Sequence, residues 1–135
     1  VVHIPRKKLF KFKLKSCKES RVDFLRNAAD ETSITYSLNI GQESNSATSL
    51  SKQIDDMLVV MAKEKTPSIL SCSDYKNFWV VFNNNGTFSF GEGMDLSNPL
   101  LVFDDANPLP TNAITLSSGK TNEFEFSKSS GTITG

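Results

Sequence analysis

The sequence has 135 residues, of which 38% are apolar, and its 15 basic residues balance 15 acidic ones. This length suits one domain with one core, and zero net charge argues against nucleic acid as a partner, because phosphate binding needs a basic face. No apolar run approaches the roughly 20 residues of a transmembrane segment, and no signal peptide is visible. From the start at Val1 we expect an excised segment whose targeting sequence is absent.

Period-two alternation of apolar and polar residues, the pattern of half-buried strands, recurs along the chain. It is found at positions 9–15, 22–24, 34–40, 87–90, 114–116 and 123–126, and the run 78–82 is apolar enough for a central strand. Strands without intervening helices predict an all-β fold, an antiparallel β-sandwich of jelly-roll-like form. We expect this domain at 9–127, after an N-terminal extension at 1–8 and before a C-terminal tail at 128–135.

The segment 83–86 reads Asn-Asn-Asn-Gly between two strand patterns, and Asn-Gly supplies the positive φ angles of tight hairpin turns. We therefore expect 78–82 and 87–90 to pair antiparallel. Trp79 then lies on one face of the hairpin, with Phe78 and Val80 on the other. This placement makes Trp79 a core residue rather than a ligand platform.

The stretch 54–61 fits two patterns. Ile54, Met57, Leu58 and Met61 follow a helical stripe, while Met57, Val59 and Met61 follow a strand. We expect two short strands around Asp55-Asp56.

Seven of the 15 basic residues lie within the first 18 positions: Arg6, Lys7, Lys8, Lys11, Lys13, Lys15 and Lys18. They suit either an anionic partner or a solvated strand face whose lysines protect a sheet edge, and we favour the second interpretation. In 123–126 the phenylalanines alternate with Glu123 and Glu125. We predict that the strands 9–15 and 123–126 are neighbours, with these lysines opposite the glutamates.

Metal and catalytic sites find little support in the sequence. The single histidine, His3, lies at an end expected to be frayed, and two cysteines are too few for a zinc site. The pairs Asp55-Asp56 and Asp104-Asp105 could bind calcium, the second with Asn107, but they lack the alternate spacing of calcium loops. We expect both pairs in solvated turns and no metal site.

Two features bear on the compartment in which the chain works. Cys17 and Cys72 are either buried free thiols or one disulfide between distant strands, and the residues leave both possibilities open. Asn85-Gly86-Thr87 is an N-glycosylation sequon on the expected hairpin turn, which favours a secreted protein.

An ordered series of segments resembles the farnesoic acid O-methyltransferase domain, a module of arthropod proteins and of multidomain extracellular proteins of other animals. The series is Cys17, YSLNIG at 36–41, Asn45, TPSILSC at 66–72, YKNFWV at 75–80, FGEG at 90–93 and FDDANPLP at 103–110. The resemblance spans about 10–126. Relatives carry glycine- and tryptophan-containing segments where this chain has 41–45 and 117–120, so both tryptophans are missing here.

The resemblance locates a ligand site in the loops 41–45, 91–95 and 117–122. The candidate binding residues are Gly41, Gln42, Glu43, Asn45, Glu92, Asp95 and Lys120.

The family name implies methyl transfer from S-adenosylmethionine, which would need a glycine-rich turn that leads from a strand into a helix. Gly91-Glu92-Gly93 lies in a β context and reads as a strand-ending turn. We therefore favour a non-catalytic recognition module of a secreted or cell-surface protein, which binds a glycan or a protein and needs no cofactor. A methyltransferase acting on a small isoprenoid acid and a structural spacer are the alternatives.

Overall fold

The structure, a computed structural model, describes residues 2–3, 7–16, 18–83, 85–118 and 123–127. In these ranges the chain forms strands, turns and one four-residue helical element. In chain order the elements are β1 (Val2–His3), β2 (Lys7–Lys15), β3 (Ser20–Leu25), β4 (Ile34–Gly41), α1 (Gln42–Asn45), β5 (Ala47–Ile54), β6 (Met57–Lys65), β7 (Lys76–Asn83), β8 (Thr87–Glu92), β9 (Leu101–Asp104), β10 (Ala113–Ser118) and β11 (Glu123–Ser127).

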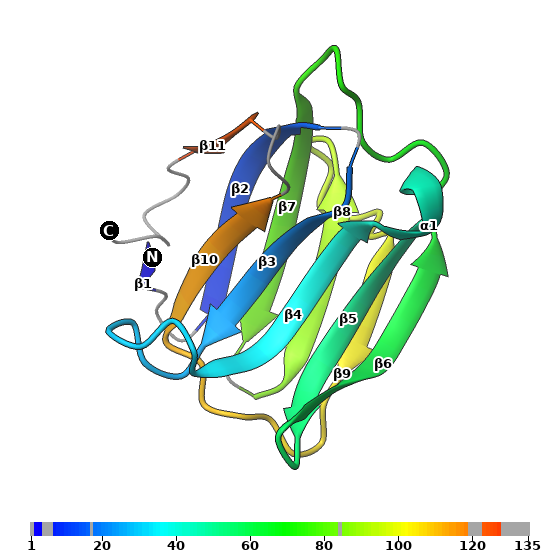
Figure 1. The fold of residues 1–135 in the computed structure, drawn as a ribbon. Coiled ribbons are helices and arrows are strands. Elements are labelled where there is room, and N and C mark those ends of the chain that lie inside the picture. The colour runs from blue at the N-terminus through cyan, green and yellow to red at the C-terminus, as the bar shows by residue number, and fades with distance from the viewer. Residues whose placement is uncertain (1, 4–6, 17, 84, 119–122, 128–135) are drawn as a thin grey trace.

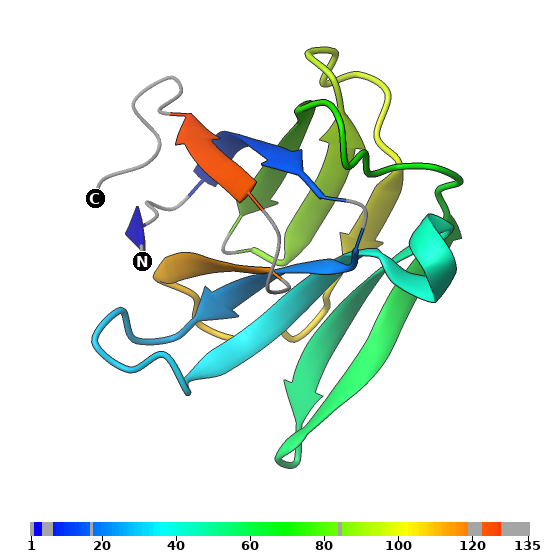
Figure 2. The same cartoon turned by 45° about the horizontal axis from the view of Figure 1, so that its top comes forward.

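Two sheets stack face to face, as Figures 1 and 2 show. The six-stranded sheet has the order β1-β10-β3-β4-β5-β6, and the five-stranded sheet has the order β11-β2-β7-β8-β9. Every neighbouring pair of strands is antiparallel. The expected antiparallel β-sandwich is thus confirmed.

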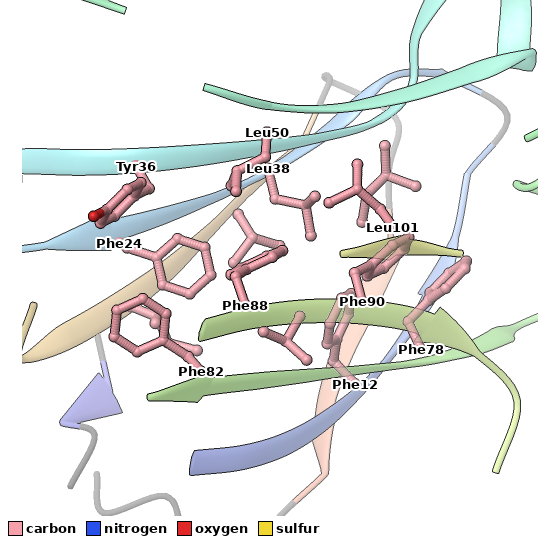
Figure 3. Close-up of a cluster of buried hydrophobic side chains, with 14 of the residues drawn as sticks. Phe12, Phe24, Tyr36, Leu38, Leu50, Phe78, Phe82, Phe88, Phe90 and Leu101 are labelled. Carbon is pink, nitrogen blue, oxygen red and sulfur yellow. The ribbon is translucent and has the colours of Figure 1, made fainter. Parts of the chain in front are cut away.

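Aromatic side chains from both sheets fill the space between the layers (Figure 3). Because successive side chains of a strand point to opposite faces, the alternating pattern of the sequence sends every second residue into this core. Phe24 of the six-stranded sheet stacks on Phe82 of the other sheet, with ring centroids 5.6 Å apart. Phe78 stacks on Phe90 at the same centroid distance. Each such pair contributes about 0.5–1.5 kcal/mol beyond the area it buries.

The β7–β8 hairpin forms as predicted, with Trp79 opposite Gly91 and Val80 opposite Phe90. Phe78 and Val80 belong to the core between the sheets, whereas Trp79 lies on the other face of its strand and is also fully buried. A Cβ atom on Gly91 would lie 2.2 Å from the Trp79 ring. The indole therefore occupies the space that any larger residue at position 91 would need.

The strand β2 pairs with β11 in the predicted way, with Lys15 opposite Glu123 and Lys13 opposite Glu125. β2 lies between β11 and β7, so the interpretation of its lysines as protection for a sheet edge is wrong. His3, at the N-terminal end that the sequence suggested to be frayed, pairs with Ala113 in the register of β1 and β10.

Two strands flank Asp55-Asp56, as predicted for the ambiguous stretch. β5 and β6 pair from Ile54 and Met57 outward, and both aspartates adopt positive φ angles, 49° and 63°. The strands are longer than expected, with eight and nine residues. The choice between a helix and two strands is made by the turn and not by the apolar pattern, because two residues in the left-handed region reverse the chain.

Candidate functional site

The outer face of the six-stranded sheet carries a row of polar side chains across four strands. Arg21, Asn39, Ser49 and Lys63 are successive partners in the registers of β3, β4, β5 and β6. Their neighbours Val22, Leu38 and Leu50 belong to the core, so strand alternation turns the row outward. No described helix or strand covers this face in Figure 1.

Buried hydroxyl and carboxylate groups on the same face of the sheet contact members of this row. Ser37 donates a hydrogen bond of 2.5 Å to Asp23, whose carboxylate also accepts a bond of 3.0 Å from Arg21. Ser49 donates a bond of 2.6 Å to the Oε1 atom of Gln42. Asp23, Ser37 and Ser49 are almost inaccessible to solvent, whereas the side chain of Arg21 is 44% exposed. The side chains of Arg21 and Gln42 are therefore held in place before any ligand arrives. We call Arg21, Asn39, Gln42 and Lys63 the polar face.

The turn Gly41–Asn45 borders the polar face and has an unusual backbone. Glu43, Ser44 and Asn45 all have φ angles between 54° and 66°, the left-handed region that costs about 1–2 kcal/mol for each non-glycine residue. The side chain of Asn45 holds the turn, because it donates to the carbonyl of Leu70 and accepts from its N–H. Such strain persists where the surrounding structure enforces it, and it is frequent at functional sites.

A pocket of about 610 Å³ opens beside this turn. Its lining residues come from α1, from the adjoining ends of β5 and β6 and from the loop residues next to them: Glu43, Ser46, Ala47, Lys63, Glu64, Lys65 and Pro67. Lys63 forms an ion pair with Glu43 at the pocket wall. Since Lys63 also belongs to the polar face, the pocket and that face form one continuous surface.

The candidate binding residues fall into separate groups. Gly41, Gln42, Glu43 and Asn45 lie in and beside α1, at the end of the six-stranded sheet. Glu92 ends β8 in the other sheet, where it pairs with Lys76 at 3.0 Å. Asp95 follows in the β8–β9 loop, and hydrogen bonds from the hydroxyl and N–H of Ser97 lower the pKa of its carboxyl. Lys120 lies outside the described residues.

Asn85 lies on the exposed turn of the β7–β8 hairpin. Its side-chain oxygen accepts hydrogen bonds from the N–H and the hydroxyl of Thr87, the third residue of the sequon. Cys72 lies before β7, and no cysteine in the described ranges is a free thiol. Cys17 lies outside those ranges, so its pairing with Cys72 stays a prediction.

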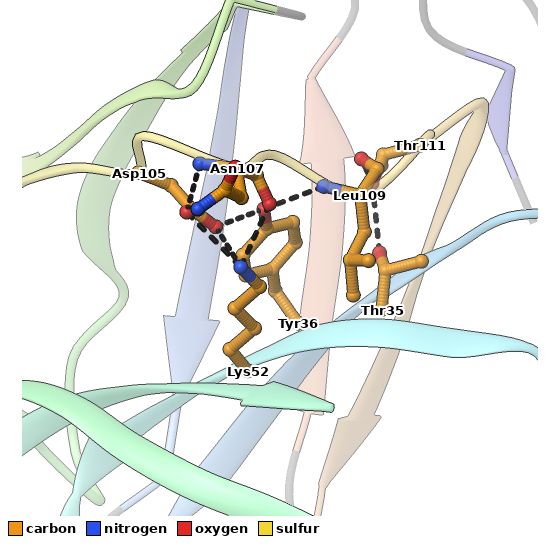
Figure 4. A network of polar contacts seen from close by, with 7 residues as sticks. All are labelled: Thr35, Tyr36, Lys52, Asp105, Asn107, Leu109 and Thr111. Atoms are coloured by element: carbon orange, nitrogen blue, oxygen red, sulfur yellow. Dashed lines mark hydrogen bonds and ion pairs between the residues drawn. The ribbon is translucent and has the colours of Figure 1, made fainter. Parts of the chain in front are cut away.

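A buried polar network joins the two sheets at the β9–β10 connection (Figure 4). Lys52 contacts the Asp105 carboxylate at 2.7 Å and donates to the Asn107 carbonyl, while Tyr36 donates a bond of 2.6 Å to Asp105. The expectation of a solvated turn at Asp104-Asp105 is therefore wrong for Asp105, which is 7% exposed. One sequence signal could have revealed the network: Thr48, Leu50 and Lys52 alternate along β5, which points Lys52 inward.

The network shifts the pKa values of two of its members. Burial, followed by the hydrogen bond to Asp105, raises the pKa of Tyr36 well above its ordinary value of 10.0. Burial also pushes the pKa of Asp105 upward, but the bonds from Lys52, Tyr36 and the Asn107 N–H outweigh it and hold the pKa below 3.8. Asp105 is thus ionised and Tyr36 neutral at physiological pH.

A family model described as farnesoic acid O-methyl transferase matches residues 2–129. The chain belongs to this family. Its β-sandwich is similar in fold to the structure of sheep galectin-11 in complex with glycerol. The TM-score is 0.60 at 12% sequence identity, over 92% of this chain and 93% of the galectin chain. A search of curated proteins found no match.

Three further findings concern the chemistry open to this family member. The described part of the chain has no cluster of three or more His, Cys, Asp or Glu side chains that could hold a metal. No helix among the described residues is long and apolar enough to cross a membrane. The segment Gly91-Glu92-Gly93 ends strand β8 and leads into turns rather than a helix.

Proposed function

We propose that the chain is a non-catalytic recognition module that binds a glycan across the polar face and the adjoining pocket. The observation that carries this proposal is a set of partly exposed amide, guanidinium and ammonium groups on one face of the sheet. Three of these four side chains already have partners on the same surface: Asp23 holds Arg21, Ser49 holds Gln42 and Glu43 holds Lys63. Sugar hydroxyls both donate and accept hydrogen bonds, and this face offers partners of both kinds. Because the groups are already ordered, binding costs less conformational entropy than it would on a mobile surface.

The similarity in fold to a galectin supports the proposal of glycan binding, since a galectin is by its name a lectin. The strained turn at Gly41–Asn45, where the family resemblance implies a ligand site, lies beside the polar face. The sequon at Asn85 and the two cysteines favour a secreted or cell-surface protein. A protein partner that binds the same face is the second outcome that an experiment should distinguish.

A glycan array, followed by calorimetry on any hit, tests the proposal. We expect Asn39→Ala to weaken glycan binding at least tenfold, the equivalent of about 1.4 kcal/mol, with little change in melting temperature. Gln42→Ala should weaken binding as much and also lower the melting temperature, because the buried Ser49 hydroxyl loses its acceptor. Asn77→Ala is the matched control, because Asn77 lies on the outer face of the opposite sheet and is exposed. No glycan hit, or equal losses for Asn39→Ala and Asn77→Ala, would contradict the proposed site.

The family description makes S-adenosylmethionine-dependent methyl transfer the alternative function. Methyl transfer would require a site for the adenosine and a sulfonium held about 3–3.5 Å from the acceptor carboxylate. The common methyltransferase class binds its cofactor at a glycine-rich turn between a strand and a helix. Both sheets here are antiparallel, and the Gly-x-Gly segment leads into turns, so this chain would need a different kind of cofactor site. We expect no heat of binding with S-adenosylmethionine at millimolar concentration and no methylation of farnesoic acid. Micromolar affinity that is lost in Glu92→Ala or Asp95→Ala would establish the enzyme instead.

A further inference from the structure

The strand β6 forms one edge of the six-stranded sheet. Its one side pairs with β5 along nearly the whole strand, and its other side faces no described strand. An edge of this kind presents unpaired N–H and C=O groups, and proteins usually protect such edges with charges, prolines or very short strands. β6 has nine residues and no proline.

The first five side chains of β6 are apolar and exposed on both faces of the strand. Five successive residues, Met57 to Met61, are between 37% and 67% exposed, and Ile54 of the adjoining strand is 38% exposed. A continuous exposed apolar run on a sheet edge is typical of a surface that another chain covers. A bulge interrupts the pairing with β5 after Val60, so the regular part of the free edge is Met57–Val60.

The charges at the two ends of β6 indicate which chain covers it. The acidic turn Asp55-Asp56 precedes the strand, and the strand ends in Lys63, Glu64 and Lys65. Antiparallel pairing of two copies about a two-fold axis brings the acidic turn of each copy beside the basic end of the other. Parallel pairing would instead bring like charges together, which is unfavourable.

We propose that β6 pairs antiparallel with β6 of a second copy of this chain and joins the two six-stranded sheets into one. The arrangement is isologous, so each contact occurs twice and the assembly closes at a dimer. It satisfies the free backbone groups and covers the apolar side chains of both copies. The polar faces of the two copies then continue one another, although the pairing stands independently of the glycan proposal.

Sedimentation velocity over a range of concentrations tests the dimer. We expect the chain to associate reversibly into dimers and Val59→Lys to remain a monomer with an unchanged fold by circular dichroism. Val102→Lys is the matched control, because Val102 is an exposed valine on β9, the edge strand of the other sheet. A monomeric parent chain, an open-ended aggregate, or equal dissociation in both variants would overturn the proposal.

A second set of variants tests the antiparallel orientation. Lys65→Glu places an acidic residue near the acidic turn of the partner and should weaken the dimer several-fold. Adding Asp55→Asn and Asp56→Gly to the same chain removes the repulsion, with residues that suit a turn of two positive φ angles. We expect the triple variant to regain most of the lost association. If the added substitutions leave the dimer as weak as in Lys65→Glu, the orientation is wrong.

Discussion

The ring of Trp79 lies where a side chain at position 91 would be, so a substitution of Gly91 should disturb the packing of this ring. Gly91→Ala would force a Cβ atom to 2.2 Å from the indole, so the ring or the strand must move. Overpacking of this kind costs about 1–3 kcal/mol. Trp79 is the single tryptophan of the sequence, so its fluorescence reports the displacement directly.

Gly93→Ala is the control for this substitution. Gly93 has a φ angle of 84°, and an added Cβ would meet nothing within 4 Å. The control should lower the melting temperature through backbone strain while leaving the fluorescence maximum unchanged. Equal spectral shifts in the two variants would show that crowding at Trp79 is not the cause.

The Lys52–Asp105–Tyr36 network predicts how stability depends on pH. The pKa of Asp105 is lower in the folded state, so its contribution is complete above about pH 4 and is lost as the pH falls through the folded-state pKa. The pKa of Tyr36 is raised, so its contribution is complete below about pH 10 and is lost above that pH. The network therefore favours a stability plateau between these limits.

Urea denaturation at a series of pH values tests this dependence. Asp105→Asn should flatten the acid limb, and Tyr36→Phe should flatten the alkaline limb. Asp105→Asn should also cost about 3 kcal/mol at neutral pH, because it leaves the Lys52 ammonium buried without its counter-ion. If stability falls as steeply at low pH in Asp105→Asn as in the parent chain, other carboxylates cause the acid limb.

At the scale of elements, the pairing of β2 with β11 permits a test by charge reversal. Lys13→Glu faces Glu125 with a like charge and should destabilise the fold by about 0.2–1 kcal/mol. Adding Glu125→Lys restores opposite charges and should return most of that free energy of unfolding. Lys11 faces Ser127, so Lys11→Glu should gain little from Glu125→Lys. Equal recovery in both combinations would point to a general effect of net charge.

The elements of this fold were more predictable than their arrangement. Alternation in a single strand decides which residues face the core, so β2, β8 and β11 could be predicted from their own sequences. The nearly continuous apolar run at 78–82 predicted β7 in the same way. The hairpin followed from Asn83–Gly86, and the pairing of β2 with β11 followed from complementary charges. The number of strands in each sheet and the position of β2 depend on contacts between distant segments, which local patterns do not encode.

The candidate site was predictable only where the family resemblance pointed to it. The resemblance drew attention to Gly41–Asn45, and the structure places that turn beside a pocket. The polar face went unnoticed because its residues come from four strands and look, one strand at a time, like ordinary solvent-facing positions. Lys52 and Asp105 are 53 residues apart in the sequence, so neither residue reveals the other.

At the scale of the molecule, the two sheets have different roles. On the outer face of the five-stranded sheet, Trp79 is fully buried. The Nζ atoms of Lys13 and Lys15 lie over the ring of Tyr75, 5.3 and 5.2 Å from its centroid. The six-stranded sheet carries the partly exposed polar face and exposes apolar side chains at its β6 edge. The outer face of the five-stranded sheet thus makes contacts within the chain, whereas the six-stranded sheet offers surfaces to other molecules.

The predicted bond between Cys17 and Cys72 would act on the whole molecule by restricting the unfolded chain. In the chain-entropy model, closing a loop of about 55 residues stabilises the fold by about 4 kcal/mol. We expect native protein to gain no mass from iodoacetamide unless a reductant is added, and then to gain two adducts. Cys17→Ser, Cys72→Ser and the double variant should lose nearly the same stability in urea, because removing either partner breaks the same bond. Two thiols that react in the native protein, or losses that add in the double variant, would exclude the bond and weaken the argument for an oxidising compartment.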